Sequence, residues 1–563
     1  ANLAAAVAER PLAGHAGIGH TRWATHGRPT EQNAHPHVDC GSVTAVIHNG
    51  IIENFEPLKE ELVAGGHRFA SETDTEVVVH LLEDQLRAGR SLEDAALAVL
   101  PRLEGAAALA FLSASDPGTL VAARVSRAGG VIVGHGDGEN FIASDIPALL
   151  EHTRRVSYLD GGDVAIVTAD AVRFRRIDGA DITKTVETVA WDPVSAAKSG
   201  YKHFLLKEIH EQPRAVSDTL LGRVERTTGR VVFDRDLALD DAYVRGLGRI
   251  TFVACGTAYH AALVGKYLVE RVARIPCDVE IASEYRYRDP VVGPGHLVVA
   301  VTQSGETVDT LAAMEAAKER GARVLALVNV VGSEASRVAD GRIYLHAGPE
   351  ISVASSKAYT CMVVDLYLLA LFLAQRREAI DPARSRELLA EAFHLPTLID
   401  AVLREEPKLR ALAHRHHQAT HFLYLGRGAN YPTALEGALK LKELSYIHAE
   451  GTAGGEMKHG TNALIDETLP VVAIALQDTT YRKMVSNIEE VRARAGVVIA
   501  LASDGDEEIG GLTGEVVRIP RTNELLSPAL AVVPLQLLAY HVADRRGNDI
   551  DQPRNLAKSV TVE

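Results

Sequence analysis

The chain has 563 residues and a formal net charge of −15, and 47% of its residues are hydrophobic but only 5% aromatic. This length exceeds what one hydrophobic core organises, so several domains are expected. The acidic balance argues against a nucleic-acid binder, which needs a basic face. We find no signal peptide and no apolar run long enough to span a membrane, and therefore expect no membrane association.

The four cysteines, Cys40, Cys255, Cys277 and Cys361, are scattered along the chain. Their spacing matches neither a metal site nor a disulfide framework, which predicts no bound metal and a reducing compartment, the cytoplasm. The sequence begins with Ala1 in place of Met, and we expect that N-terminal residues are missing from it.

Residues 1–190 combine short apolar runs with glycine-rich turns, which is typical of an α+β layer structure. Strands are expected at Val43–His48, Ala107–Ser113 and Val131–Gly134, the first of them ending just before Asn49 and Gly50. The charged, irregular stretch 191–245 is interpreted as a linker with lead-in helices.

Several polar residues of this first part suit a pocket for an amino-acid amide. Arg22 could bind an α-carboxylate through two parallel hydrogen bonds, and Asp74 could hold an α-ammonium group. Asn49 and the backbone N–H of Gly50 could stabilise an oxyanion. A polar surface loop is a plausible alternative for each piece, but it is a weak explanation for all of them together.

From residue 246 the pattern changes to alternating strands, turns and helices, which predicts parallel, doubly wound sheets. Three apolar segments recur 170 to 174 residues later: those beginning at Phe252, Val298 and Val324 correspond to those beginning at Phe422, Val471 and Val498. This repeat predicts two copies of one α/β subdomain, residues 246–400 and 401–550, followed by a polar tail, residues 551–563.

The turn Thr302–Thr307 joins a valine-rich strand to a helix. A helix start offers unpaired N–H groups and a dipole that favours an anion. Hydroxyl and amide groups of this turn can add donors, and no Lys or Arg lies within it, which suggests a sugar phosphate rather than a nucleotide. The alternative is an ordinary helix cap. The candidate phosphate ligands are Thr302, Gln303, Ser304 and Thr307.

A helix is expected over Ala434–His448, with Glu436, Lys440 and Glu443 on one face. This spacing is common in solvated salt-bridge ladders, but it could also place Glu443 to move a proton beside a carbonyl. His459, in the glycine-rich segment that follows, could transfer a proton near neutral pH or be an ordinary turn histidine.

Motifs in order along nearly the whole chain resemble the glucosamine-6-phosphate synthase family. They are His20–Gly27, His48–Asn54, Ser71–Glu76, Val253–Thr257, Thr302–Thr307, Val353–Lys357, Leu435–Glu443, Lys458–Gly460 and Asp551–Glu563. The resemblance implies an N-terminal-nucleophile glutaminase domain, here incomplete, and two sugar-isomerase subdomains. It also implies glutamine and fructose 6-phosphate as substrates, an ammonia channel, glucosamine 6-phosphate as product, a homodimer, and no metal or organic cofactor.

The resemblance also implies roles for individual residues. Arg22, His26 and Asp74 would bind glutamine, Asn49 and Gly50 would stabilise its tetrahedral intermediate, and Trp23 would gate the channel. The Thr302–Thr307 residues would hold the phosphate, with Thr257, Val353 and Ser355 lining the sugar. Lys558 would form a Schiff base, His459 would assist ring opening, and Glu443 would move the proton, with Lys440 beside it.

One departure concerns the nucleophile, because the family's N-terminal cysteine is absent and Cys40 lies inside the chain. A polypeptide of this sequence is therefore expected not to hydrolyse glutamine. An alternative is a sugar-phosphate isomerase or binding protein with a non-functional glutaminase half, but the retained pocket residues favour the synthase. A DNA-binding sugar-phosphate sensor is disfavoured, since no basic reading helix is evident.

Overall fold

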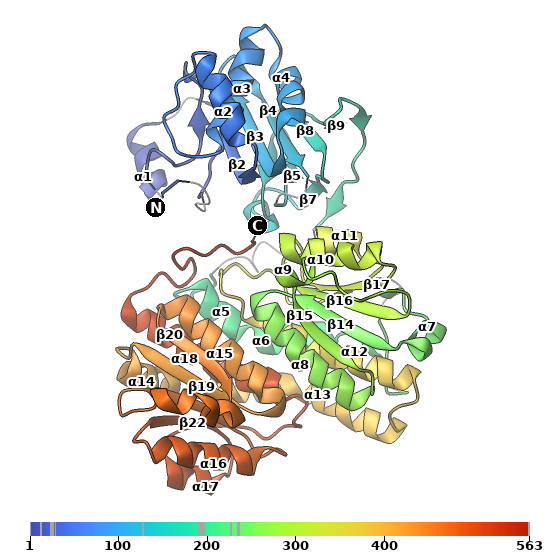
Figure 1. The fold of residues 1–563 in the computed structure, drawn as a ribbon, viewed down its shortest axis with the longest axis vertical. Coiled ribbons are helices and arrows are strands. Elements are labelled where there is room, and N and C mark those ends of the chain that lie inside the picture. Colours follow the sequence, from blue (N-terminus) through green and yellow to red (C-terminus); the bar gives the residue numbers. More distant parts are fainter. Residues whose placement is uncertain are drawn as a thin grey trace. The chain divides into compact units, whose positions relative to one another are not determined.

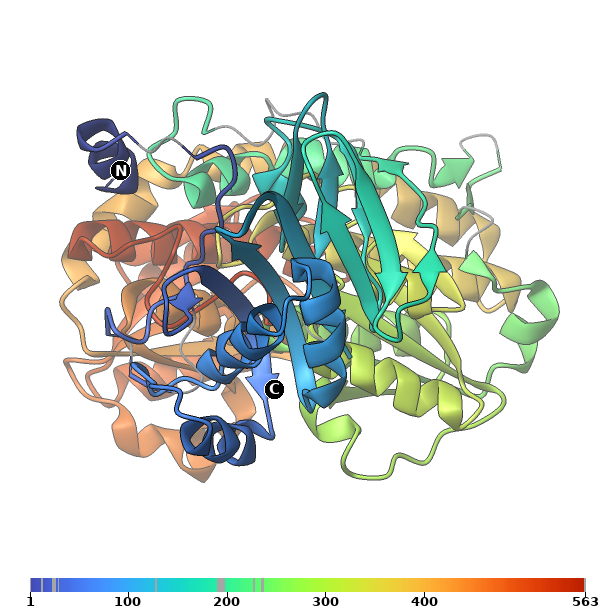
Figure 2. The same ribbon diagram turned by 90° about the horizontal axis from the view of Figure 1, so that it is seen from above.

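The computed structural model describes residues 2–560 apart from 12–13, 23–26, 29, 127–128, 190–197, 226–227 and 234–236. The chain divides into two compact units, residues 1–193 with 559–563, and residues 194–558. Figures 1 and 2 show the ribbon in two views, coloured along the sequence. Trp23 and His26 lie outside the described residues.

In its described residues, the first unit contains two antiparallel sheets. The seven-stranded sheet has the order β1 (His37–Val38), β2 (Thr44–Ile52), β3 (Gly105–Ser113), β4 (Asp116–Val125), β8 (Asp163–Val167), β9 (Val172–Arg176), β10 (Asp181–Ile182). The four-stranded sheet has the order β11 (Glu187–Thr188), β7 (Arg155–Tyr158), β5 (Ile132–His135), β6 (Asn140–Ala143). The helices are α1 (Asn2–Glu9), α2 (Phe55–Ala64), α3 (Glu76–Arg87), α4 (Leu92–Val99) and the short 3-10 turns η1 (Leu100–Arg102) and η2 (Ile146–Ala148).

Two apolar cores hold these layers together. The larger core packs buried residues of α2, α3 and α4, such as Leu62 and Leu82, against Phe111 and other residues of the seven-stranded sheet. A smaller core, which includes Val133 and Ala165, lies between the two sheets. The unit is therefore layered as helices, sheet and sheet, and Figure 1 shows α2, α3 and α4 on the sheet face formed by β2, β3 and β4.

The expected end of a strand before Asn49 and Gly50 is wrong. β2 continues through both residues to Ile52, and Gly50 pairs with Ala107 in the register of β2 and β3. Gly50 has a φ of +132°, and a Cβ there would lie 2.0 Å from the carbonyl oxygen of Ala106. Glycine thus marks a close backbone approach inside the strand, not a turn after it.

The second unit contains two five-stranded parallel sheets with the same strand order. The first runs β15 (Cys277–Ile281), β14 (Arg249–Ala254), β16 (His296–Thr302), β17 (Arg323–Val328), β18 (Gly341–Tyr344). The second runs β20 (His448–Ala453), β19 (His421–Gly426), β21 (Pro470–Ala475), β22 (Val497–Ser503), β23 (Glu515–Ile519). The three repeated sequence segments lie on equivalent strands of the two sheets, which confirms the predicted duplication.

Helices cover both faces of each sheet, as a doubly wound fold requires. They include α8 (Gly256–Val272), α9 (Ala282–Tyr285), α10 (Val308–Glu319), α11 (Glu334–Val338), α12 (Lys357–Arg376), α13 (Pro382–Leu403), α14 (Glu406–His416), α15 (Tyr431–Ser445), α16 (Tyr481–Arg492), α17 (Glu507–Leu512) and α18 (Ser527–Arg546). In Figure 1, α8, α12, α15 and α18 lie on the sheet faces that are turned toward each other. One continuous core joins these helices, so the two subdomains share their interior.

The stretch between the two units contributes to this core. After residue 198 it forms α5 (Phe204–His210), α6 (Gln212–Leu220), a hairpin of β12 (Val224–Glu225) and β13 (Arg230–Val231), and α7 (Asp241–Gly246). Leu205, Ile209 and Val216 are buried in the shared core. The lead-in helices are therefore packed elements of the second unit.

The expectation that no segment reaches membrane-spanning length is wrong for α12. This 20-residue helix has a window with a mean hydropathy of 1.6, long and apolar enough to cross a membrane, but 94% of that window is buried inside the second unit. A helix that is apolar on all sides suits the centre of a large core equally well. α12 is apolar on all sides because it packs inside the core, and a hydropathy value does not distinguish this position from a membrane.

The helix expected over Ala434–His448 begins earlier and ends earlier. α15 spans Tyr431–Ser445, and Tyr446 ends it with a φ of +61°. The chain then enters β20 at His448.

We predict that Gly437→Ala in α15 lowers the free energy of unfolding by about 1 kcal/mol. A Cβ there would lie 2.8 Å from Leu535 Cδ1 and 2.9 Å from Tyr424 Cε1, and overpacking costs about 1–3 kcal/mol, which outweighs the gain of about 1 kcal/mol in helix propensity. Gly511→Ala, exposed in α17 with open space at its Cβ, is the matched control and is expected not to destabilise. Urea unfolding followed by circular dichroism measures both; equal effects would contradict the packing argument.

Candidate functional site

The two sequence motifs of the first subdomain meet at one edge of its sheet. Gly256 and Thr257 follow β14, and the turn Thr302–Thr307 follows β16. β14 and β16 are neighbours in the sheet. The strand that follows β14 along the chain, β15, lies on one side of this pair, and the strand that follows β16, β17, lies on the other side. In open α/β sheets, ligands bind at such a switch point, outside the carboxyl ends of the strands.

The turn Thr302–Thr307 is held in shape by its own side chains. Thr302 Oγ1 accepts a hydrogen bond from the backbone N–H of Gly305 (3.2 Å), and Ser304 Oγ accepts one from Glu306 (3.2 Å). Gly305 has a φ of +74°, and a Cβ there would lie 2.2 Å from Ser333 Oγ. Only glycine fits this close approach, so the sequence pattern encodes the turn directly.

The same turn leaves donors available at the start of α10. Thr307 precedes the helix, but its side chain makes no capping hydrogen bond. The turn is therefore not an ordinary side-chain cap. Gln303, Ser304 and Thr307 are partly exposed, whereas Thr302 is buried. The helix start and these groups can therefore bind an anion.

Lys440 is the centre of a buried network that joins α15 to α8. Its Nζ lies 2.6 Å from Glu443 Oε2 and 3.4 Å from Glu436 Oε1, and it donates a hydrogen bond to Thr257 Oγ1 at 2.9 Å. Thr257 in turn donates to Glu436 (3.1 Å), which also contacts His260 Nδ1 at 2.8 Å. Lys440 and Glu436 are buried, and the side chain of Glu443 is 21% exposed. A solvated salt-bridge ladder is thus excluded.

The network fixes the charge of Lys440. Burial alone would lower the pKa of this lysine, but the carboxylates of Glu436 and Glu443 outweigh burial and raise it. Lys440 is therefore a permanent cation and not an amine nucleophile. Its positive charge can stabilise a negative charge that develops on a ligand beside Glu443.

Lys558, in the C-terminal tail, meets a second buried carboxylate. Its Nζ donates to Glu350 Oε2 at 2.7 Å and to the carbonyl oxygen of Ser352 at 2.8 Å. Burial would raise the pKa of Glu350, but Lys558 and the N–H groups of Ser356 and Ala358 outweigh burial and lower it. Glu350 also adds to the field that raises the pKa of Lys440, so the two lysine networks are neighbours.

Glu208 of α5 is a further buried carboxylate beside Glu350, and it was not identified from the sequence. It accepts hydrogen bonds from the N–H groups of Ile351 and Ser352. Burial, with a further contribution from Glu350, raises the pKa of Glu208 to about 8. No spacing signal could have identified Glu208 or Glu350, because they come together only through folding, from positions more than 140 residues apart.

The tail that carries Lys558 is held against the second unit rather than frayed. Asp551 accepts hydrogen bonds from the N–H groups of Phe204 and Leu205, both at 3.0 Å, and its carbonyl oxygen accepts one from Val353. Within the described residues, the hydroxyl groups of Ser352, Ser355 and Ser356 are buried without a hydrogen-bond partner. Unused buried hydroxyls beside Lys558 are suited to a polyhydroxylated ligand.

His459 lies apart from both lysine networks. It ends the 3-10 turn η6 (Gly454–His459), which is followed by η7 (Thr461–Leu464), and it is exposed. In the described part of the chain, no hydrogen bond or ion pair joins it to Lys440, Glu443 or Lys558.

The candidate amide-pocket residues lie in the first unit. Asn49 Oδ1 lies 2.6 Å from His20 Nε2, and the buried Asp74 accepts a hydrogen bond from the N–H of Ile52 at 2.8 Å. Arg22 donates to the carbonyl oxygen of Gly27 at 3.2 Å. Burial lowers the pKa of Arg22, and the nearby Asp74 partly offsets this effect.

Comparison with known proteins assigns both units to families. Residues 20–151 match the family described as a glutamine amidotransferase domain. Residues 245–372 and 417–543 match the SIS domain family.

Curated relatives match over nearly the whole chain. The glutamine–fructose-6-phosphate aminotransferase (isomerizing) of Thermus thermophilus is 51% identical over 561 residues, 100% of this chain and 91% of that protein. The protein of the same name from Caldanaerobacter subterraneus is 48% identical, covering 98% and 90%. A solved C-terminal domain of glucosamine-fructose-6-phosphate aminotransferase from Francisella tularensis is 39% identical with a TM-score of 0.61, covering 63% of this chain and 99% of that one.

We predict that Lys440→Met lowers the free energy of unfolding by about 3–5 kcal/mol, because it leaves the buried Glu436 without its cation. Combining it with Glu436→Gln is expected to recover part of the loss. Lys442→Met, exposed on the same helix, is the matched control and should change stability by less than about 0.5 kcal/mol. The measurement is urea unfolding; equal effects of both lysine substitutions would show that the network does not stabilise the fold.

Proposed function

Because this chain belongs to the glutamine–fructose-6-phosphate aminotransferase (isomerizing) family, we propose that it converts D-fructose 6-phosphate and L-glutamine to D-glucosamine 6-phosphate and L-glutamate. The single observation that best supports this is the presence of two lysine–carboxylate networks, those of Lys440 and Lys558, in the unit that carries the turn Thr302–Thr307, with Glu350 of the second network contributing to the raised pKa of Lys440. The first lysine is held as a cation by two carboxylates of its own helix, and the second is carried by the C-terminal tail, with 15% of its side chain exposed.

The sugar phosphate would bind at the switch point of the first sheet. The turn Thr302–Thr307 would hold the phosphate through the start of α10 and the side chains of Gln303, Ser304 and Thr307. Thr257, Val353 and Ser355 would line the sugar, whose hydroxyl groups would use the uncommitted serine hydroxyls.

Lys558 would form the Schiff base with the open-chain ketose. An amine attacks a carbonyl only when it is deprotonated, so the Lys558 ammonium must first lose a proton. Glu350, whose Oε2 lies 2.7 Å from Lys558 Nζ, would hold the Lys558 side chain in position for the attack. Attack on the carbonyl carbon then expels its oxygen as water, and ammonia later replaces the lysine.

Glu443 would move the proton between C1 and C2 of the sugar. This step needs a positioned base beside an acidified C–H bond. Lys440, 2.6 Å from Glu443, would hold that carboxylate in place and stabilise the enolate-like intermediate. The exposed His459 would assist ring opening, at the site of its own chain or at that of a second copy in the proposed homodimer.

The first unit would supply ammonia as a glutaminase of the N-terminal-nucleophile type. Arg22, His26 and Asp74 would bind glutamine, Asn49 and Gly50 would form the oxyanion site, and Trp23 would gate a channel. We propose the domain limits 1–190, 191–245, 246–400, 401–550 and 551–563 for glutaminase, lead-in, two isomerase subdomains and closing tail. The enzyme would act in the cytoplasm, where four free cysteines are stable, without nucleic acid, membrane or organic cofactor.

The chain is expected to form glucosamine 6-phosphate from fructose 6-phosphate with ammonium as the nitrogen donor, because imine formation and proton transfer are proposed for Lys558 and Glu443 of the second unit. The assay follows glucosamine 6-phosphate. No product, with fructose 6-phosphate still bound, would contradict the proposed reaction and favour a binding protein.

Glu443→Gln is expected to lower kcat of the ammonium-dependent reaction by about 10²- to 10⁴-fold, the usual contribution of a general base. The KM for fructose 6-phosphate should change little, because the phosphate turn is untouched. Glu489→Gln, exposed on α16, is the control. The measurement is steady-state kinetics; an unchanged kcat would remove Glu443 from the proton transfer.

A further inference from the structure

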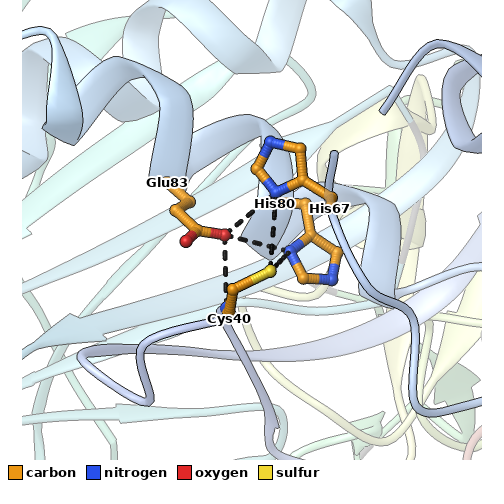
Figure 3. A group of neighbouring side chains, drawn as sticks. All are labelled: Cys40, His67, His80 and Glu83. Carbon is orange, nitrogen blue, oxygen red and sulfur yellow. Dashed lines mark hydrogen bonds and ion pairs between the residues drawn. The ribbon is translucent and has the colours of Figure 1, made fainter. Parts of the chain in front are cut away.

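Four side chains of the first unit converge in a cluster that the proposed reaction does not use (Figure 3). Cys40 lies in the turn between β1 and β2, His67 follows α2, and His80 and Glu83 lie one turn apart on α3. One donor atom from each of these four residues lies within 4.8 Å of the other three. His67, His80 and Glu83 are buried, and Cys40 is half-buried.

The distances fit one small cation at the centre. Cys40 Sγ lies 3.8 Å from His67 Nδ1 and 3.7 Å from His80 Nδ1. Glu83 Oε2 lies 3.0 Å and 3.1 Å from the same two nitrogens. Zinc bonds of about 2.3 Å to sulfur and about 2.0–2.1 Å to nitrogen or oxygen place tetrahedral ligand atoms roughly 3.3–3.6 Å apart. These four pairs are within a few tenths of an ångström of that geometry, and no pair of the four atoms is more than 4.8 Å apart.

The outer nitrogens of both imidazole rings face carboxylates. His67 Nε2 lies 2.9 Å from Asp84 Oδ1, and His80 Nε2 lies 3.6 Å from Glu76 Oε1. Metal-binding histidines commonly donate their second N–H to a carboxylate, which fixes the tautomer. With the proton on Nε2, each Nδ1 directs a lone pair toward the cluster, where Glu83 and Cys40 also present lone pairs. A central cation satisfies all four ligands at once.

We propose that Cys40, His67, His80 and Glu83 bind one Zn²⁺ ion in a closed, structural site. A thiolate with two imidazoles and one carboxylate suits zinc and disfavours Mg²⁺ and Ca²⁺, which prefer oxygen ligands alone. On binding, the Cys40 thiol releases its proton to the buffer. The sequence predicts no metal site here, because the four residues come from three elements and show no compact spacing.

The site would fasten a loop of the candidate amide pocket. Glu76, which faces His80, accepts hydrogen bonds from the N–H groups of Ala70 and Ser71, both at 2.7 Å. Glu76 thereby holds the start of the loop that carries Asp74. Zinc would order α3 and this loop together, a role independent of whether the chain acts on glutamine.

The test is metal analysis of the whole chain, purified without chelator and then incubated with Zn²⁺ and passed through gel filtration. About one zinc per chain is expected for the wild type, and none for Cys40→Ser. Asp84→Asn, which leaves all four ligands, is expected to weaken zinc binding about 10- to 100-fold. Cys277→Ser and His152→Gln, a buried cysteine and an exposed histidine outside the cluster, should keep the zinc.

Co²⁺ provides a readout that does not depend on how stable the variants are. Added to the chelator-treated wild type, Co²⁺ should give a thiolate-to-cobalt charge-transfer band and the strong visible bands of tetrahedral cobalt, with Zn²⁺ abolishing both. A wild type that retains no zinc and shows no cobalt–thiolate band would overturn the proposal and leave a hydrogen-bonded cluster. Because neither readout needs turnover, failure of the proposed reaction is distinguished from failure of this site.

Discussion

The buried ion network of Lys440 is the interaction on which the second unit depends. A lysine inside a shared apolar core is tolerated only when its charge is compensated, and here two carboxylates of its own helix do so. Thr257 extends the network to α8 of the other subdomain. The same contacts therefore align two sheets and place a fixed positive charge beside Glu443, so stability and the proposed chemistry rest on one set of atoms.

The second constraint is the turn that follows β16. Its geometry is local: Gly305 has a positive φ, and the hydroxyls of Thr302 and Ser304 bind backbone N–H groups within three residues. Local features of this kind can be predicted from sequence, as can strands of repeated valines. The turn, the doubly wound sheets and the duplication were all predicted. Each can be recognised from the types of neighbouring residues or from the spacing at which apolar segments recur.

What sequence could not predict depends on contacts between distant segments. Glu208 and Glu350 meet beside Lys558 only after folding, and the continuation of β2 through Gly50 follows from a close approach to Ala106. The high hydropathy of α12 likewise reflects its burial in the core of the second unit, which only the structure shows. The cluster around Cys40 is a further case, since its other three members, His67, His80 and Glu83, come from α3 and the loop after α2.

The identical strand order of the two sheets carries a consequence for how such a molecule could have arisen. A duplicated subdomain begins with two equivalent crevices, yet only the first copy keeps the Gly305 turn, while the helix of the second copy, α15, supplies Lys440 and Glu443. In the proposed reaction, one copy would hold the anion and the other would transfer the proton. Such a division would make the duplication irreversible, because neither half would retain a complete site that selection could maintain alone.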